Sequence, residues 1–180
     1  RHLREDILSQ RATHDNLTGL PNRYLYEDRL NQYIMLAKRQ KSALVLIVCD
    51  LDDFKMINDQ YGHLAGDSLL KTVAERLVSC VRETDTVTRF GGDEFVMLLP
   101  CDLGQEEVVS RRATDCLFDS LKKGLIIDTD RVGIKMTCGG AFYPTDTDDP
   151  TLLFSYADKA LYAAKKAGKS CFKTWRELSS

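Results

Sequence analysis

Apolar and polar residues follow one another along the chain in patterns that predict strands and helices in a mixed order. The strongest apolar run extends from Ala43 to Asp50 and is rich in valine, leucine and isoleucine. A run of this length without polar alternation is typical of a central strand that is covered on both faces. It ends abruptly in acid at Asp50, Asp52 and Asp53. We therefore expect the centre of a sheet here, with carboxylates emerging at its end.

Other segments carry the helical repeat, in which apolar residues recur every three or four positions. The clearest example places leucine, valine and alanine on one face between Leu69 and Val81. A loop at residues 61–63 separates this helix from a shorter one before it, and Asn22 is suited to cap an earlier helix. The remaining predicted helices cover residues 1–13, 23–39, 54–60, 105–122 and 151–167.

Strands are marked by short runs of β-branched and aromatic residues between turn signals. Residues 86–90 and 94–99 form two such runs, and Gly91-Gly92-Asp93 between them indicates a tight hairpin. Two further strands are predicted over residues 132–142 and 171–175. After the opening helices the order is β-α-α-β-β-α-β-α-β. This order predicts an α/β fold with one mixed sheet covered by helices.

We expect three parts in the chain: a helical linker at residues 1–14, one globular domain at 15–176 and a short tail at 177–180. Leu3 and Ile7 fall at heptad-like spacing in the linker. The linker is either a surface helix or the end of a coiled-coil stalk. It is too short for a heptad pattern to distinguish between the two. A stalk would connect the domain to an upstream sensory domain, whose input signal the sequence does not reveal.

The composition is that of a globular protein with a sizeable core, since 43% of residues are hydrophobic and 29% are charged. The formal net charge of −2 gives no general attraction to nucleic acid or to an anionic membrane. A phosphate ligand would therefore need a few placed cations or a metal. The longest apolar run is too short to span a bilayer, and the charged opening segment does not resemble a signal peptide. We expect a cytoplasmic domain, with any membrane anchor elsewhere in a longer protein.

The six cysteines are scattered along the chain and include no C-x-x-C pair. Cys49, Cys80 and Cys116 lie in apolar patterns. This placement favours buried free thiols over disulfides or a zinc site. It also agrees with a reducing compartment.

Two acidic clusters are expected to converge at one edge of the sheet. Asp50 ends the buried strand, while Asp93 and Glu94 lie at the hairpin tip, where two glycines let another group approach the backbone. Neighbouring carboxylates repel unless a proton or a cation lies between them. Hard oxygen ligands favour Mg²⁺, which adds substrate phosphates to its shell. On spacing alone, a helix-capping role for Asp50 and a turn role for Asp93 stay equally open.

Five longer motifs show which family the chain resembles. In order, they are D-N-L-T-G-L-P-N-R (15–23), D-L-D-D-F-K-M-I-N-D (50–59), G-H-L-A-G-D (62–67), R-F-G-G-D-E-F (89–95) and A-D-K-A-L-Y-A-A-K (157–165). Over about residues 15–175 the chain closely resembles the GGDEF family of diguanylate cyclases. The resemblance implies a palm-like, mainly antiparallel sheet similar to that of nucleotidyl cyclases and polymerases. It also implies an enzyme that joins two GTP molecules into cyclic di-GMP and releases two pyrophosphates.

The resemblance assigns this chemistry to particular residues. Asp50, the carbonyl of Leu51 and Asp93 would hold Mg²⁺, or Mn²⁺, against the triphosphate. Two metals about 3.5–4 Å apart would clamp the attacking and leaving oxygens. Asp93 or Glu94 would help to deprotonate the attacking 3′-hydroxyl, and the sequence does not choose between them. Lys55 would stabilise charge on the phosphates.

The same resemblance places the guanine base against Asn58 and Asp67. A carboxylate can accept hydrogen bonds from both N1–H and the exocyclic amine of guanine, whereas adenine offers no such pair, so Asp67 favours GTP over ATP. The alternative role for Asp67 is a charge that stabilises a helix N-terminus. Phe54 would line the substrate site. His63 either lines that site or is a structural residue of its loop.

Two cations near the end of the predicted 151–167 helix are expected to meet the β- and γ-phosphates. Lys165 and Lys169 would share one face if the helix continues past Gly168. The second cation of the family is more often arginine, which binds phosphate in a bidentate manner. Lys169 thus departs from the family pattern. The alternative to a phosphate-binding role is that Lys169 is a lysine exposed to solvent. The run from Thr137 to Gly140 also departs from it, and we expect that run to alter strand packing rather than chemistry.

One further match is regulatory. Arg82 and Asp85 form an R-x-x-D motif at the family position of the product-inhibition site. Arginine can form paired hydrogen bonds with a product phosphate or with guanine, while Asp85 can accept hydrogen bonds from the N–H groups of guanine. Arg111 or Arg112 would complete the site. By itself, R-x-x-D is more often an exposed charge pair at a helix end.

Each domain would carry one GTP, so the reaction requires two domains face to face and a homodimer is expected. The leading hypothesis is an active, Mg²⁺-dependent cyclase that its product inhibits. The rival is a catalytically silent receptor that binds cyclic di-GMP through Arg82 and Asp85. Silent members of the family usually lose the acidic hairpin, which is intact here. A structural dimerisation module would leave the guanine and metal residues unexplained.

Overall fold

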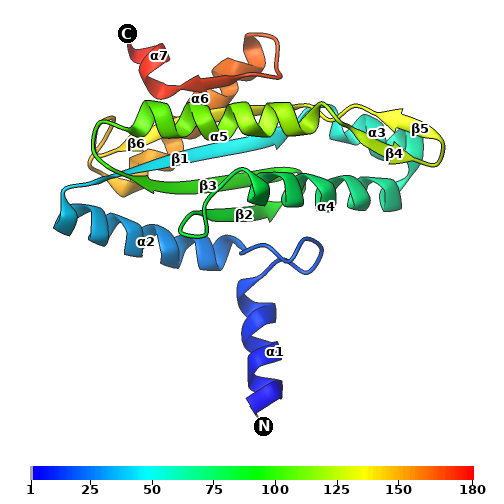
Figure 1. Ribbon diagram of the computed structural model, residues 1–180, viewed down its shortest axis with the longest axis horizontal. Coiled ribbons are helices and arrows are strands. Elements are labelled where there is room, and N and C mark those ends of the chain that lie inside the picture. Colours follow the sequence, from blue (N-terminus) through cyan, green and yellow to red (C-terminus); the bar gives the residue numbers. More distant parts are fainter. Residues whose placement is uncertain (1) are drawn as a thin grey trace.

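The computed structural model describes residues 2–180, which fold around a five-stranded sheet with the order β2-β3-β1-β6-β7 (Figure 1). Neighbouring strands are antiparallel except for the parallel pair β6 and β7. The predicted mixed, mainly antiparallel sheet is therefore confirmed. Its strands are β1 (Ala43–Leu51), β2 (Thr86–Gly91), β3 (Glu94–Cys101), β6 (Met136–Tyr143) and β7 (Phe172–Thr174).

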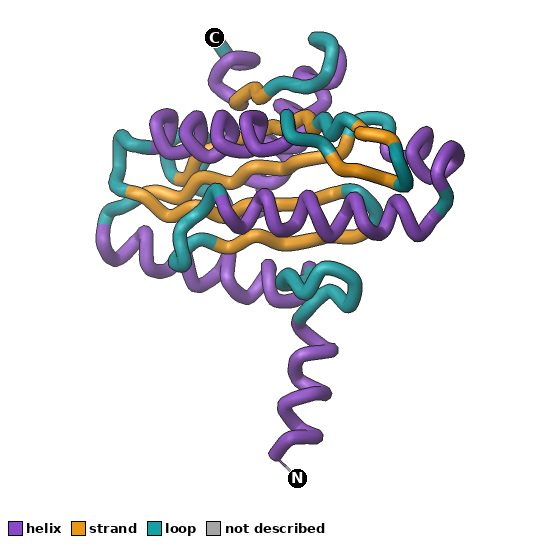
Figure 2. Tube along the Cα trace, turned by 45° about the vertical axis from the view of Figure 1, so that its right-hand side comes forward, coloured by secondary structure: helices purple, strands orange, loops and turns teal. Residues whose placement is uncertain are grey.

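Helices cover both faces of this sheet (Figure 2). The helices α4 and α5 share one hydrophobic core with the sheet, while α2 and α6 share a second core with its opposite face. The helices are α1 (His2–Thr13), α2 (Arg23–Gln40), α3 (Phe54–Tyr61), α4 (His63–Ser79), α5 (Glu106–Leu121), α6 (Pro150–Lys166) and α7 (Trp175–Ser179).

The central strand β1 is buried on both faces, as its unbroken apolar run predicts. Val45 and Ile47 belong to the core under α4 and α5, whereas Leu44 and Leu46 belong to the core under α2 and α6. All four side chains are fully buried. Alternate residues of a strand point to opposite faces, so a strand between two helical layers needs apolar residues at every position.

Gly139 on β6 lets α6 lie close against the sheet. A Cβ atom at this position would come within 2.1 Å of the backbone nitrogen of Leu161 and 2.4 Å of the carbonyl oxygen of Ala157. Any other residue here would therefore push α6 away from the sheet. Because α6 carries Lys165, this contact also determines where that cation lies.

Two predicted boundaries in the middle of the chain are wrong. The strand expected over residues 132–142 begins only at Met136, because residues before it form a separate hairpin of β4 (Leu125–Ile127) and β5 (Asp130–Val132). The loop expected at 61–63 shrinks to Gly62, which separates α3 from α4 with a positive φ of 89°. A glycine adopts such a φ without steric cost, so one residue suffices for the turn.

The end of the chain also differs from prediction. The closing strand is present, but Trp175 begins α7 instead of ending the strand. Thr174 and Glu177 form a capping box that starts this helix. The predicted tail at residues 177–180 is therefore partly helical.

Cys80 and Cys116 form a disulfide, which corrects the prediction of free thiols at these two positions. Cys80 follows the last residue of α4 and Cys116 lies on α5, and their Cα atoms are 5.6 Å apart. The pairing was not predictable because 36 residues separate the two cysteines and only the packing of α4 on α5 joins them. Cys49 is a buried free thiol, as predicted.

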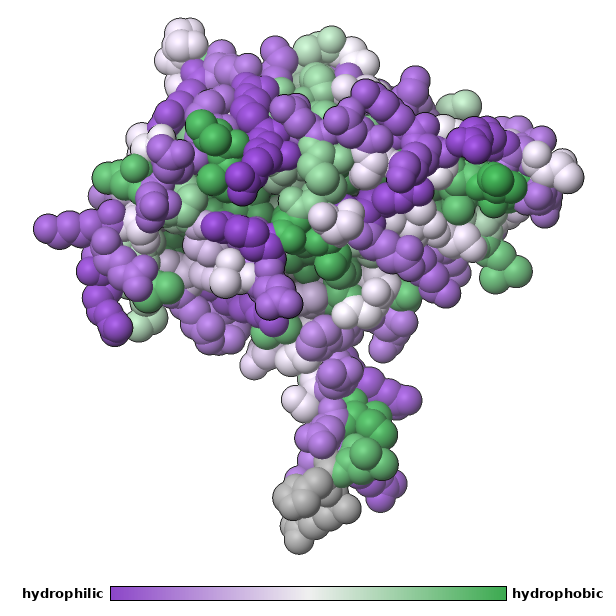
Figure 3. Space-filling view, in the orientation of Figure 1, coloured by the Kyte–Doolittle hydropathy of each residue, from purple (hydrophilic) through white to green (hydrophobic). Residues whose placement is uncertain are grey.

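The N-terminal helix α1 projects from the body of the domain (Figure 1). Leu3, Ile7 and Leu8 are exposed on it, and apolar side chains colour part of this projection green in Figure 3. The segment is a helix, as predicted, and whether it forms a coiled-coil stalk stays a prediction. Within the described residues, no helix is long and apolar enough to cross a membrane.

Candidate active site

The carboxylates of Asp50, Asp93 and Glu94 come together where β1 meets the β2–β3 hairpin. Asp50 and Glu94 are directly opposite each other in the antiparallel pairing of β1 with β3. The backbone nitrogen of Leu51 donates a hydrogen bond to the carbonyl oxygen of Asp93 at 3.3 Å. The convergence predicted from the sequence is therefore present in the fold.

The hairpin tip is built by two glycines in backbone conformations that other residues rarely adopt. Gly91 has a φ of 138° and Gly92 has a φ of 52°. Glycine carries no Cβ atom and takes up positive φ values at little cost. The turn therefore presents Asp93 and Glu94 toward β1.

Two carboxyl groups of the cluster, those of Asp93 and Glu94, have raised pKa values. Burial, then the nearby charge and side chain of Asp50, raises the pKa of Asp93 above its ordinary value of 3.8. Burial, then the charge of Asp50, also raises the pKa of Glu94. A site of this kind favours a proton or a cation between the carboxylates.

The donor set at this cluster fits Mg²⁺. Across the described part of the chain, no group of three or more His, Cys, Asp or Glu side chains is placed to hold a metal ion by itself. Mg²⁺ does not need such a cage, because it commonly binds one or two carboxylates together with substrate phosphates. Asp50, Asp93 and the carbonyl of Leu51 supply this smaller set of oxygens.

Both predicted phosphate-binding lysines reach the acidic cluster or the residues beside it. Lys165 forms an ion pair with Asp50, and this partner raises the pKa of Lys165 although partial burial works against its charge. The Nζ atom of Lys169 lies 3.2 Å from an oxygen of Asp53. These cations balance the charge of the acidic groups at the end of β1.

Lys169 reaches this position by a different route from the one predicted. The helix α6 ends at Lys166, so Lys165 and Lys169 do not share a helical face. Gly168 has a φ of 118° and Lys169 itself a φ of 64°, which turn the chain back toward β1. The sequence left open whether the helix continues past Gly168, and the structure shows that it ends at Lys166, close to the predicted end at residue 167.

Asp52 fixes the turn that carries Lys169, a role that the sequence did not reveal. It is buried and accepts hydrogen bonds from the hydroxyl of Thr137 at 2.7 Å and from the backbone nitrogen and hydroxyl of Ser170 at 3.1 and 3.0 Å. Buried carboxylates require such partners. The end of β1 is thereby tied to the loop after α6.

The predicted guanine-binding residues come from the two helices that follow β1. Asn58 lies on α3 and Asp67 on α4, and both are half-buried. A Cβ atom on Gly66 would lie only 1.9 Å from Oδ1 of Asn58, so this glycine makes room for the amide.

The other predicted substrate residues lie on the same pair of helices. Phe54 begins α3 and packs against the main core, Lys55 is exposed on α3, and His63 is exposed at the start of α4. Their contact with a substrate stays a prediction.

An ion pair that the sequence did not reveal holds the tip of the β2–β3 hairpin. Arg89 donates hydrogen bonds to the carbonyl oxygen of Gly92 at 3.0 and 2.8 Å and pairs with both oxygens of Asp15 at 3.0 and 3.1 Å. Burial works against the charge of Asp15, but hydrogen bonds from Thr18 and Arg89 lower its pKa. Asp15 belongs to the loop after α1, so this ion pair connects the N-terminal segment to the turn beside Asp93.

The R-x-x-D motif forms a local ion pair at the end of α4. The Arg82 guanidinium lies 3.1 Å from Oδ1 of Asp85, whose carboxylate also accepts the backbone N–H of Arg82 at 2.7 Å. Arg82 is 51% exposed and Asp85 only 4% exposed, so the arginine is the accessible member.

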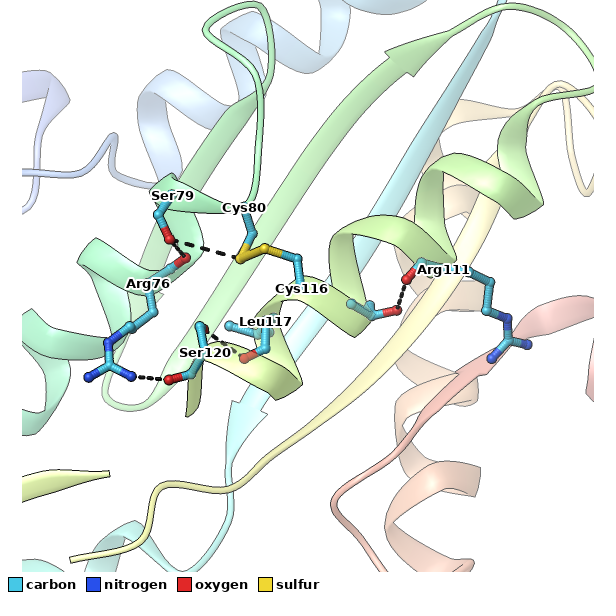
Figure 4. Close-up of a disulfide and its surroundings, with 8 residues drawn as sticks. Arg76, Ser79, Cys80, Arg111, Cys116, Leu117 and Ser120 are labelled. Atoms are coloured by element: carbon cyan, nitrogen blue, oxygen red, sulfur yellow. Dashed lines mark hydrogen bonds between the residues drawn. A yellow bond between two sulfur atoms is a disulfide. The ribbon is translucent and has the colours of Figure 1, made fainter. Parts of the chain in front are cut away.

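Arg82 and Arg112 line one groove of about 370 Å³, together with Tyr33 of α2 and Asp102 after β3. Of the two candidate partners, Arg112 is therefore the one placed beside the motif. Arg111 points away, toward the C-terminal strand (Figure 4), and it pairs with Glu107 on its own helix and with Glu177 on α7.

Comparisons with known proteins show the family to which the chain belongs. The family model described as "Diguanylate cyclase, GGDEF domain" matches residues 12–171. The chain is 42% identical over 167 residues to the bifunctional diguanylate cyclase/cyclic di-GMP phosphodiesterase MucR of Pseudomonas aeruginosa, which covers 92% of this chain and 24% of MucR. Compared with the first curated relatives, the chain spans between about a quarter and about half of their length.

Solved structures match the fold over nearly the whole domain. The GGDEF domain of TpbB from Pseudomonas aeruginosa has a TM-score of 0.85 and 36% sequence identity, with 93% of this chain and 99% of that chain covered. The coiled coil and GGDEF domain of DgcB from Caulobacter crescentus, solved in complex with c-di-GMP, has a TM-score of 0.84 and 27% identity, with 96% and 92% covered. The chain therefore belongs to the GGDEF domain family of diguanylate cyclases.

Proposed function

We propose that this domain is a Mg²⁺-dependent diguanylate cyclase that condenses two GTP molecules into cyclic di-GMP and two pyrophosphates. The observation that supports this most is the proximity of Asp50, Asp93 and Glu94 where β1 meets the β2–β3 hairpin, with raised pKa values at the last two. A cluster of this kind is suited to bind a cation and to accept a proton. The names of the relatives, which include several diguanylate cyclases, point the same way.

In this mechanism, the 3′-hydroxyl of one GTP attacks the α-phosphorus of the other. A new oxygen–phosphorus bond forms, the bond from the α-phosphorus to the pyrophosphate oxygen breaks, and two such steps close the ring. Mg²⁺, held by Asp50, the Leu51 carbonyl and Asp93, would neutralise charge on the triphosphate; Mn²⁺ would serve in the same donor set. Asp93 or Glu94 takes the hydroxyl proton, because a raised pKa makes either a better base.

Lys165 and Lys169 then contact the β- and γ-phosphates. Without substrate they pair with Asp50 and Asp53, so binding of a triphosphate exchanges a carboxylate partner for a phosphate partner. Lysine keeps the necessary charge, although it lacks the bidentate geometry that arginine would supply. Lys55, exposed on α3, adds a cation that stabilises charge on the phosphates.

Guanine is selected between α3 and α4. Asp67 accepts hydrogen bonds from N1–H and the exocyclic amine, and Asn58 contacts the same base. Phe54 and His63 line the rest of this pocket. With ATP bound, the Asp67 carboxylate would face adenine without a pair of hydrogen-bond donors. This loss makes GTP the preferred substrate over ATP.

The catalytic unit is a homodimer, because each domain supplies one GTP and the two nucleotides must meet. GTP as substrate implies a cytoplasmic domain. A sensory domain in a longer protein would control the dimer, which agrees with the small share of MucR that the chain covers.

The groove that Arg82 and Arg112 line is proposed to bind cyclic di-GMP and to inhibit the enzyme. Asp85 either accepts hydrogen bonds from guanine or keeps the ion pair with Arg82 that it forms in the free domain and so orients the arginine. Support comes from the structure of DgcB, which was solved in complex with c-di-GMP.

The test uses purified protein with GTP and Mg²⁺, followed by chromatography and mass spectrometry. We expect cyclic di-GMP from the native chain and none from Asp93→Ala. The matched control is Asp119→Ala, an exposed aspartate that pairs only locally with Lys122 and whose loss should leave the product yield unchanged. Absence of product at high protein concentration, together with tight binding of cyclic di-GMP, would establish the receptor instead.

A further inference from the structure

The Cys80–Cys116 disulfide joins the two chain segments that supply the arginines of the product groove. Cys80 lies two residues before Arg82, and Cys116 lies four residues after Arg112 on α5. Residues four apart on a helix lie on neighbouring turns of one face. The bond therefore sets the spacing between the segment after α4 and the turn of α5 that carries Arg112.

The disulfide is accessible to small redox reagents. Cys116 is exposed and Cys80 is half-buried. The groove also contains Cys101, whose thiol is partly buried, and burial followed by the charge of Glu106 raises its pKa to about 11. A thiol with so high a pKa is a poor nucleophile at neutral pH, so Cys101 does not compete for the disulfide.

Other contacts between α4 and α5 remain when the disulfide is broken. Arg76 on α4 donates a hydrogen bond to the carbonyl oxygen of Ser120 (Figure 4) and another to the carbonyl oxygen of Gly124. These contacts hold the helices together near the end of α5, on the side of the disulfide away from Arg112. Reduction would therefore remove the covalent link beside Arg112 while these hydrogen bonds still join the two helices.

We propose that Cys80 and Cys116 form a reversible redox site whose disulfide state strengthens binding of cyclic di-GMP in the groove between Arg82 and Arg112. The inference rests on the proposed inhibitory function of that groove. Disulfides in cytoplasmic proteins are typically transient and redox-sensing, which is the behaviour assigned here. A more oxidising environment would thus lower the output of the cyclase.

The chemistry balances with glutathione disulfide as the oxidant. One cysteine thiolate attacks a sulfur of glutathione disulfide, forms a mixed disulfide and releases one glutathione. The second cysteine then attacks the protein sulfur of the mixed disulfide and releases the other glutathione. The two protons lost by the cysteines appear on the two glutathione thiols, and excess glutathione or a dithiol reverses both steps.

The first measurement establishes the redox site itself. The full chain is equilibrated with glutathione and glutathione disulfide in varied ratios, alkylated and analysed by mass spectrometry. We expect Cys80 and Cys116 to become protected together, and the melting temperature to rise by about 5–10 °C on oxidation. Cys116→Ser should abolish that rise, whereas Cys171→Ser should keep it. A pair that never closes, or one that resists all reduction, would overturn the redox site.

The second measurement tests coupling to the groove. Calorimetric titration with cyclic di-GMP should show about fivefold or greater tightening in the oxidised chain compared with the reduced one, and no such difference in Cys116→Ser. Equal affinity in both states would overturn the coupling and leave the inhibitory site in place. No binding in either state would reject both the coupling and the proposed inhibitory groove.

Discussion

Lys165, near the end of α6, forms an ion pair with Asp50, at the end of β1, although 115 residues separate them in the chain. The pair joins a cation proposed for the substrate phosphates to a carboxylate proposed for the metal. In the free domain each compensates the charge of the other. Binding of a metal and a triphosphate would give both residues a new partner at the same time.

Replacement of Lys165 by methionine is therefore expected to weaken catalysis strongly. The variant loses a cation that faces developing phosphate charge, and we expect kcat/KM for GTP to fall by about 10²-fold. Steady-state measurement of pyrophosphate release provides the test. Lys122→Met is the matched control, since Lys122 pairs with Asp119 on the exposed surface of α5. Similar activity in the two variants would contradict the role given to Lys165.

The raised pKa of Asp93 predicts a stability effect with a definite sign. Its folded-state pKa lies above the usual value of 3.8, so ionisation opposes folding. At a pH below the unfolded-state pKa, Asp93 is protonated in both states and does not affect stability. As the pH rises from the unfolded-state pKa to the higher folded-state pKa, the free energy of unfolding falls, and above the folded-state pKa the loss is complete. Asp93→Asn should raise the melting temperature of the free domain by about 2–4 °C at pH 7.5, and by less at pH 5. A lower melting temperature than wild type at pH 7.5 would contradict the carboxylate cluster.

Arg89 is expected to act as a positioning residue for the catalytic hairpin. Arg89→Ala removes the hydrogen bonds to Gly92 and the ion pair with Asp15, which should cost about 2 kcal/mol in the free energy of unfolding. We expect kcat to fall more than the affinity for GTP, because Asp93 loses its fixed turn. Denaturation and steady-state kinetics measure the two effects. A change confined to KM would argue against a role in positioning.

Gly66 is expected to control guanine binding through Asn58. Gly66→Ala would place a methyl group on Oδ1 of Asn58 and displace the amide, so KM for GTP should rise about 3- to 10-fold. Alanine is favoured over glycine in a helix, which limits the loss of stability. Gly133→Ala is the matched control, because a Cβ atom there meets nothing within 4 Å. Equal KM values in the two variants would contradict the packing of Asn58 on Gly66.

The parts of the site that depend on a local pattern of residues could be predicted from the sequence. The strand before Asp50 and the hairpin before Glu94 each follow from a short run of residues, and their antiparallel pairing brings the acids together. The sequence left open how the chain continues past Gly168, where positive φ values at Gly168 and Lys169 form a turn after α6.

Contacts between distant segments could not be predicted from such local patterns. The disulfide between Cys80 and Cys116 depends on how two helices pack, and the ion pair between Asp15 and Arg89 depends on how a loop folds back over the sheet. The hydrogen bonds of Asp52 likewise join β1 to residues far along the chain. Only the assembled sheet brings these partners within contact distance.

The measurement that tests the central proposal most directly is the stoichiometry of the reaction at several protein concentrations. With GTP and Mg²⁺, one cyclic di-GMP should form for every two pyrophosphates released. The rate per domain should increase with protein concentration, because two domains must meet. Pyrophosphate release without cyclic di-GMP, or no reaction at any concentration while cyclic di-GMP still binds, would contradict the proposal that this domain is a diguanylate cyclase.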